Sequence, residues 1–249
     1  MKILVIPDTH ARPFWRVPVQ ENISKVDKVI FLGDEPDPYM DEGVKYKWED
    51  VEQNLNDIIS LKKEYPDKVE LLLGNHSEHY RNLQFRKVAI SVRFDAAHAN
   101  YLYDIYNGDN YGLFKIAHTE KIGDVTFLFT HAGVSNFWAN LVGLKIDDTI
   151  ADQLNEMEDS DDGISKLAII GRERTWFGAK TGSPLWCDIK EMVNDKGIGN
   201  GIFQIFGHSR LKEGAIIEME NYACVDSRTA FIVSSDRRNK KGFSIKKIL

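Results

Sequence analysis

The feature of this sequence that most constrains its fold is a set of five short apolar runs, each followed at once by polar residues with reactive side chains. Apolar runs of five or six residues that end at glycine or turn-forming residues are typical of buried strands. The runs are Lys2–Ile6, Lys28–Leu32, Val69–Leu73, Val125–Thr130 and Ile202–Phe206. They predict a sheet in which each of these strands ends at residues whose side chains can bind a ligand or take part in a reaction.

The segments between these runs predict an α/β fold. Apolar residues recur at helical spacing within Lys45–Glu64, between the second and third runs, which indicates a βαβ unit and a largely parallel sheet. The region Lys145–Val193 has a helical and irregular pattern. Four further strands, expected to be antiparallel, follow near the end of the chain at Ala215–Met219, Tyr222–Val225, Ala230–Ser234 and Phe243–Leu249. This order predicts two packed sheets, the second closed by the C-terminal strands.

Composition excludes several classes of protein. The formal net charge of −6 gives no broad attraction to nucleic acid or to an anionic membrane, so a phosphate substrate would need local positive charge. No apolar run approaches the ~18 residues of a membrane span, and no signal peptide is recognisable. Cys187 and Cys224 form neither a disulfide framework nor a thiolate metal motif. A cytoplasmic protein of 249 residues, without a membrane partner, is therefore expected.

The polar residues at the strand ends predict a metal centre. In open α/β sheets the functional site lies at the carboxyl ends of the strands, which would bring these residues together. Their nitrogen and oxygen atoms suit divalent manganese, iron, zinc or nickel. The candidate ligands are Asp8, His10, Asp34, Asn75, His131 and His208.

The motifs resemble those of the calcineurin-like metallophosphoesterases. The sequences DTH, GDEPD, GNH, HAG and GH begin at Asp8, Gly33, Gly74, His131 and Gly207, in the order and at the spacing typical of that family. Within the family, the C-terminal half is most similar to phosphoprotein phosphatases of the phage lambda type. The resemblance implies a four-layer α-β-β-α sandwich of two mixed sheets. It also implies a single domain over residues 1–249, with a helical insertion at about 145–193.

The resemblance also implies roles for the ligands. Asp8 and His10 would bind one divalent ion and Asp34 would bridge two. Asn75, His131 and His208 would complete the second site. Arg210 stands where some members have a further histidine, so water would fill that place. Manganese is the expected metal, with iron, zinc or nickel as alternatives.

The resemblance implies hydrolysis by in-line attack of a metal-bridging hydroxide on phosphorus. His76 would protonate the leaving group as general acid, and Asp37 would orient its ring. Asp37 could instead simply open a turn before Pro38. The expected reaction is hydrolysis of a phosphomonoester on a protein or a small molecule. Hydrolysis of a nucleotide phosphodiester or a dinucleoside polyphosphate, and a non-catalytic scaffold, are the alternatives.

The sequence departs from the phosphatase pattern where substrate is held. Pro38 and Tyr39 replace an arginine and a glycine of the second motif, so one expected phosphate-binding arginine is absent. Arg172 and Arg174, in a segment similar to one that carries such an arginine, are candidates for binding phosphate, and Arg12 could replace the missing one. The aromatic segment Tyr101–Tyr111, with His98, could either pack in the core or cover the site and select substrates.

Overall fold

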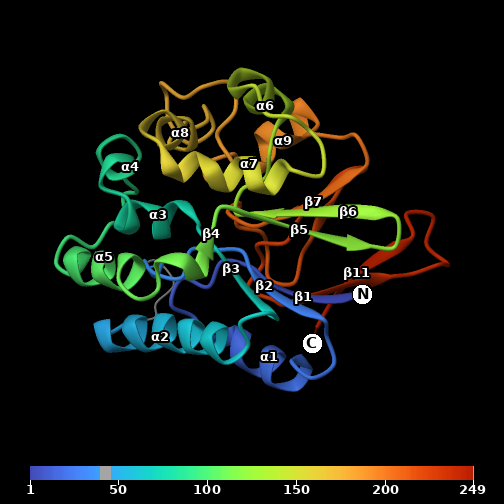
Figure 1. Ribbon diagram of the computed structural model, residues 1–249, viewed down its shortest axis with the longest axis horizontal. Coiled ribbons are helices and arrows are strands. Elements are labelled where there is room, and N and C mark those ends of the chain that lie inside the picture. The colour runs from blue at the N-terminus through green and yellow to red at the C-terminus, as the bar shows by residue number, and fades with distance from the viewer. Residues whose placement is uncertain (40–45, 249) are drawn as a thin grey trace.

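The computed structural model describes residues 1–39 and 46–248, which form two facing sheets with helices on both outer sides (Figure 1). The first sheet has six strands in the order β11 (Phe243–Lys247), β10 (Phe231–Ser235), β1 (Lys2–Ile6), β2 (Lys28–Phe31), β3 (Val69–Leu72) and β4 (Phe114–Lys115). The second has five, in the order β5 (Ala117–Ile122), β6 (Val125–Thr130), β7 (Ile202–Phe206), β9 (Tyr222–Cys224) and β8 (Ile217–Glu218).

Helices cover the outer side of each sheet. In Figure 1 one group lies at the first sheet, with α1 (Arg16–Asn22) and α2 (Trp48–Glu64) below it and α5 (Ala99–Asn107) to its left. Two short helices, α3 (Asn75–Arg81) and α4 (Leu83–Val88), follow β3. The other group lies above the second sheet, namely α6 (Asn136–Val142), α7 (Ile150–Glu156), α8 (Asp161–Leu167) and α9 (Ile189–Asp195). The expected four-layer α-β-β-α sandwich of two mixed sheets is confirmed.

A dry core between the two sheets fixes their relative position. Along β1, Ile3 and Val5 point into this core, whereas Leu4 and Ile6 pack against the helices, as the two-residue period of a strand requires. The second sheet contributes aromatic residues, among them Phe127 and Phe203, whose ring centroids lie 5.5 Å apart. Each sheet is therefore held by its partner on one side and by helices on the other.

The strands that carry the five motifs run parallel within their sheets. β1 pairs with β2, and β2 with β3, in parallel register. In the second sheet β6 and β7 also pair in parallel, with Phe129 opposite Ile205. Parallel neighbours present their carboxyl ends at the same edge, so the residues after these strands are brought together.

The prediction for the C-terminal strands is partly wrong. β9 pairs in parallel with β7, and only β8 joins it antiparallel at the edge of the second sheet. β10 and β11 belong to the first sheet, where β10 pairs antiparallel with β1 and places Phe231 and Val233 in the core between the sheets. Thus β9 and β8 complete the second sheet, whereas β10 and β11 cover the open edge of β1 in the first.

Residues 145–193 contain α7, α8 and most of α9, joined by irregular chain. They connect β6 to β7 and lie over the second sheet (Figure 1). Within residues 1–39 and 46–248, none of the helices has both the length and the apolar character that crossing a membrane demands.

A glycine contact joins the ends of β2 and β3. Gly33 has a φ of +98°, and a Cβ added to it would lie 2.5 Å from the backbone nitrogen of Gly74. Both the backbone conformation and the close approach therefore require glycine. This contact sets the distance between the two loops that carry Asp34 and Asn75.

We expect Gly33→Ala to destabilise the fold more than a matched substitution in open space. Gly123 also has a positive φ, +63°, but a Cβ there would meet nothing within 4 Å. Gly123→Ala should cost about 1–2 kcal/mol from its left-handed backbone alone. Gly33→Ala should cost about 1–3 kcal/mol more, because the new methyl overlaps backbone. Urea unfolding of both variants measures the difference, and equal losses would contradict the packing argument.

Candidate metal centre

The six predicted metal ligands lie together at the carboxyl edge of both sheets. Asp8 and His10 follow β1, Asp34 follows β2, and Asn75 begins α3 directly after β3. His131 and His208 come from the second sheet, after β6 and β7. All six are at most 7% exposed. The site is therefore built by both sheets and closed off from bulk water.

The loops that carry these residues have unusual backbone conformations. His10, Asp34 and His208 have φ values of 44°, 56° and 64°, in the left-handed region that non-glycine residues rarely adopt. Their neighbours Ala11 and Asp37 do the same, at 62° and 59°. Such strain persists only where the surrounding structure enforces it, and it concentrates at functional sites. Here backbone hydrogen bonds of 2.8 Å from His10 to Asp34 and from Ala11 to Glu35 tie the loops together.

One half of the centre consists of Asp8, His10 and Asp34. His10 Nε2 lies 3.9 Å from Asp8 Oδ2 and 3.7 Å from Asp34 Oδ2. These three residues present one ligand atom each, all within 4.8 Å of one another. Two carboxylates and an imidazole that converge in this way are a suitable site for a divalent cation.

The other half shares Asp34 and adds two histidines and an asparagine. His131 Nε2 lies 3.4 Å from Asp34 Oδ2, 3.1 Å from Asn75 Oδ1 and 3.0 Å from His208 Nδ1. Asp34, His131 and His208 again offer ligand atoms within 4.8 Å of one another. Asp34 is the residue common to both groups, so its carboxylate is placed to bridge two ions.

Neighbouring backbone groups orient the ligands. His10 Nδ1 donates to the carbonyl of Pro36 at 3.1 Å, and His131 Nδ1 donates to that of Leu32 at 2.8 Å. In each ring this leaves the Nε2 lone pair directed at the centre, the arrangement that metal-binding histidines use. The backbone N–H of His76 donates to Asp34 Oδ1 at 2.8 Å, and that of His208 to Asp8 at 3.1 Å.

The charges of the site favour cations at its centre. Burial raises the pKa of Asp8 to about 7. Burial opposes ionisation of Asp34 as well, but the charges of His131 and His76 hold its pKa well below the ordinary value. Burial likewise lowers the pKa of His131, and Asp34 and Asp8 outweigh it and raise that pKa to about 10. Without metal, a proton on His131 must balance these carboxylates.

The residues fit two first-row divalent ions. Such ions bind nitrogen and oxygen at ~2.0–2.2 Å, so two ligands of one ion lie at most ~4.4 Å apart. The separations of 3.0 to 3.9 Å between the ligand atoms named above satisfy this limit. His208 faces the centre with Nδ1, whereas its buried Nε2 has no hydrogen-bond partner among the described residues.

His76 and Asp37 form a pair beside the metal centre. His76 Nδ1 lies 2.6 Å from Asp37 Oδ2, and Tyr80 donates to the other carboxylate oxygen at 2.5 Å. His79 Nε2 lies 3.0 Å from Asp37 Oδ2. Burial opposes the charge of Asp37, but hydrogen bonds from His76 and His79 outweigh it and lower its pKa. The carboxylate is thus held ionised against the His76 ring.

Arg93 is a site residue that the sequence did not reveal. Its Nη2 lies 2.9 Å from His76 Nε2, and its Nη1 donates to the carbonyl of Asp37 at 2.6 Å. A guanidinium only donates hydrogen bonds, so His76 Nε2 accepts here and Nδ1–H donates to Asp37. Arg93 lies in an irregular loop before α5 with no motif around it.

The predicted phosphate-binding arginines differ in their surroundings. Arg12 lies with its guanidinium carbon 5.0 Å from the ring centre of Tyr39, and Arg93 and Arg210 approach the same ring at 3.8 and 4.9 Å.

Arg174 donates to the carbonyl of His208 at 3.3 Å and pairs with Asp188 at 2.9 Å. Arg172 is exposed, and its backbone N–H donates to Ala179. The roles of Arg12, Arg172 and Arg174 stay predictions.

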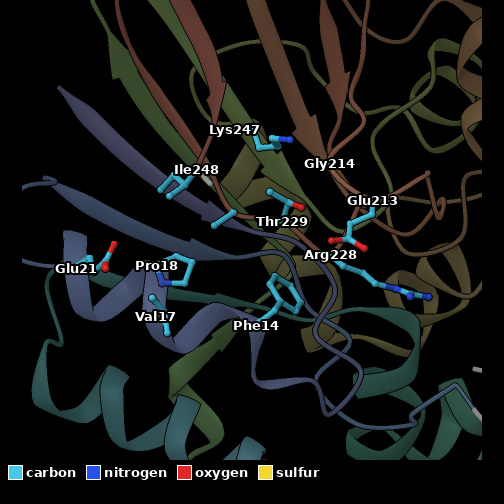
Figure 2. A pocket seen from close by; sticks show the side chains of 11 residues that line it. Phe14, Val17, Pro18, Glu21, Glu213, Gly214, Arg228, Thr229, Lys247 and Ile248 are labelled. Carbon is cyan, nitrogen blue, oxygen red and sulfur yellow. The ribbon is translucent and has the colours of Figure 1, made fainter. Parts of the chain in front are cut away.

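A separate hollow contains none of these residues. It lies between the α1 region and the C-terminal part of the chain, has a volume of about 470 Å³, and is lined by Phe14, Val17 and Ile248 among others (Figure 2). Its charged residues, such as Glu213 and Lys247, carry no metal-binding geometry. The chemistry described above is thus confined to the sheet edge.

Comparisons with known proteins agree with this arrangement. The family described as "Calcineurin-like phosphoesterase" matches residues 1–209. A protein serine/threonine phosphatase from Saccharomyces cerevisiae, with similarity to human phosphatase PP5, is similar in structure, with a TM-score of 0.51 and 14% identity over 100% of this chain and 79% of its own.

Two further solved structures are more distant. A metallophosphoesterase from Sphaerobacter thermophilus has a TM-score of 0.43 and 11% identity, over 100% of this chain and 89% of its own. The phosphoesterase Yfce from E. coli has a TM-score of 0.40 and 12% identity, over 95% and 90%. No curated protein sequence matches the chain significantly.

We expect the chain to bind two manganese ions, and single substitutions to remove one or both. Asp34→Asn should abolish both sites because it removes the shared negative charge, whereas His208→Asn should abolish one. Asparagine tolerates the left-handed backbone at both positions. Isothermal titration with Mn²⁺ counts the ions, and a bound ion at ~100 times its Kd should add about 2.7 kcal/mol to the stability of the wild type.

His118→Asn is the matched control, because His118 lies on β5 and pairs with Glu120 at 3.0 Å, away from the centre. It should bind both ions. Undiminished binding of two ions by the Asp34→Asn variant would contradict the bridging role.

Proposed function

This chain belongs to the calcineurin-like phosphoesterase family and is a phosphoric ester hydrolase, and on that premise we propose that it hydrolyses a phosphomonoester with His76 as general acid. The observation that carries the proposal is the hydrogen-bonded pair of His76 and Asp37, at 2.6 Å, directly beside the shared carboxylate of Asp34. A monoester leaves as an alkoxide, which needs a proton, and this pair is placed to supply it.

The ligands proposed for the metal are the six residues described above, and two divalent ions bound there would activate water and offset the charge of the phosphoryl oxygens. The resemblance favours manganese as the metal. It also supports a relationship to the phage lambda-type phosphatases through the segment Gly171–Arg174, in which Arg174 donates to the carbonyl of His208 in this chain. We further propose that residues 1–249 act as one domain in the cytoplasm. Two buried free thiols, Cys187 and Cys224, support that location.

Different residues of the chain have different roles in the proposed reaction. Arg93 donates to the phosphoryl oxygens when substrate is bound, which releases His76 Nε2 from its present contact at 2.9 Å. Asp37 fixes the ring through Nδ1 and stabilises the protonated imidazole. Nε2 then holds the proton that the departing oxygen requires. Tyr80, Asp37 and His76 form a continuous hydrogen-bonded chain that keeps this orientation.

Hydrolysis of a nucleotide phosphodiester or a dinucleoside polyphosphate is the second candidate. It is supported by the three arginines around Tyr39, which could hold a second phosphate. With manganese, a monoesterase should hydrolyse p-nitrophenyl phosphate with a higher kcat/KM than bis(p-nitrophenyl) phosphate. The reverse preference would favour the second candidate.

His76→Asn should lower kcat for p-nitrophenyl phosphate by about 10²-fold or more, because the variant cannot donate the proton. Manganese binding should remain, since His76 contributes only its backbone N–H to Asp34. Steady-state kinetics and Mn²⁺ titration on the same sample separate the two effects. Unchanged turnover, with His118→Asn as the reference, would rule out the acid role.

Arg93→Lys should lower kcat/KM and weaken inhibition by inorganic phosphate together. Lysine keeps the charge but loses the forked contact, and a charged hydrogen bond is worth about 1.5–3 kcal/mol, or roughly 10- to 100-fold. Arg16→Lys is the control, because Arg16 pairs with Asp57 at 2.5 Å on the surface. If phosphate inhibited the Arg93→Lys variant as strongly as the wild type, Arg93 would have no part in holding the phosphoryl group.

A further inference from the structure

We propose that the hollow beside His76 receives the leaving group, and that this leaving group is a nucleoside, so that the substrate is a nucleoside monophosphate. This inference rests on the proposed monoesterase function and adds the identity of the alcohol to it. The hollow has a volume of about 420 Å³, within the usual range of ligand pockets of ~300–1,000 Å³. It is separate from the hollow of Figure 2, and Asp37 of the acid pair lines it.

The hollow adjoins the proposed proton donor through two residues that contact His76. Asp37 and Arg93 both line it, and both contact His76. Ser91, at the start of the same loop, lies with its hydroxyl 3.0 Å from His76 Nε2. An oxygen protonated by Nε2 would therefore be attached to a group that extends along the loop around Val92 and into the hollow. The position favours the leaving group and not the phosphoryl group.

The walls of the hollow are aromatic and apolar. Trp48, at the start of α2, stacks on His98, with ring centroids 3.7 Å apart and planes inclined by 3°. The buried residues Val51 and Leu102 form the floor behind them. Val92 is fully exposed at the rim, where its side chain is accessible to a ligand in the hollow. Flat ring systems bind to such surfaces by stacking and by loss of water from apolar area.

Hydrogen bonds connect this wall to the catalytic pair. Tyr80 donates to Asp37, and its oxygen accepts the backbone N–H of Asp95 at 2.7 Å. The carboxylate of Asp95 in turn accepts from His98 Nδ1, also at 2.7 Å. The stacked pair of His98 and Trp48 thus has a fixed position relative to the proton donor. A preorganised wall of this kind suits a specific ligand better than a mobile one.

Polar groups at the hollow distinguish a nucleoside from a plain aromatic ring. With Nδ1 donating to Asp95, His98 keeps Nε2 as an acceptor, and the described residues offer that atom no partner. Lys47 also lines the hollow and adds a donor. Apolar walls with a few fixed donors and acceptors match a base and sugar, which carry both faces and hydrogen-bonding edges.

The test compares two monoesters that differ in the leaving group, adenosine 5′-monophosphate and glycerol 2-phosphate. The wild type with manganese should prefer the nucleotide by about tenfold or more in kcat/KM, as expected for one stacked base. Trp48→Ala should raise KM for the nucleotide by about tenfold and change glycerol 2-phosphate by less than about twofold. Trp176→Ala is the matched control, because Trp176 is 96% exposed and does not line the hollow.

Val92→Asn is a second variant, at an exposed position where a substitution does not endanger folding. It should raise KM for the nucleotide and not for glycerol 2-phosphate, by a smaller factor than Trp48→Ala does. Equal effects of these variants on both substrates, or a wild type that prefers glycerol 2-phosphate or a phosphotyrosine peptide, would overturn the nucleoside assignment and leave the monoesterase intact. A wild type active only on bis(p-nitrophenyl) phosphate would instead remove the proposed function, and this inference with it.

Discussion

The shared carboxylate of Asp34 is the constraint on which the site depends. Side chains of His10 and His131 approach one of its oxygens at 3.7 and 3.4 Å, and the backbone of His76 donates to the other at 2.8 Å. This carboxylate is almost fully buried and has Asp8 close by, so it is stable only if positive charge is concentrated there. The left-handed backbone of His10, Asp34 and His208 lets each of these side chains turn toward the centre just after its strand ends.

The two sheets place the two halves of this centre, so their packing is also a determinant of the chemistry. Asp8, Asp34 and Asn75 belong to the first sheet, whereas His131 and His208 belong to the second. A sideways shift of one sheet by a fraction of the 3.1 Å between His131 Nε2 and Asn75 Oδ1 would separate ligands that come from different sheets. The aromatic core between the sheets resists such a shift because close-packed interiors deform little. Residues far from the metal therefore control its coordination.

Local sequence predicted the five motif strands and the residues that meet at the sheet edge, because each motif lies within a few residues of its own strand. It failed where structure depends on contacts between distant segments. β4 and β5 were not foreseen, since AHTEKI of β5 is largely polar and half-buried. The place of β10 beside β1 follows from an open sheet edge that no local pattern encodes. Arg93 is an arginine in an irregular loop, 17 positions after His76, and only folding brings it to 2.9 Å from the ring.

The substituted second motif shows why such distances matter more than positions in the sequence. Pro38 and Tyr39 stand where the resemblance predicts an arginine and a glycine, so the motif lacks one arginine when it is compared position by position. In space the Tyr39 ring lies within 5.0 Å of the guanidiniums of Arg12, Arg93 and Arg210, from three different loops. A phosphoryl group requires positive charge close to it in space, and any part of the sequence can supply that charge. The Tyr39 ring lies 4.7 Å from that of His10 and packs against arginines from elsewhere, at the place where we propose that phosphate binds. One of these arginines, Arg93, also lines the leaving-group hollow.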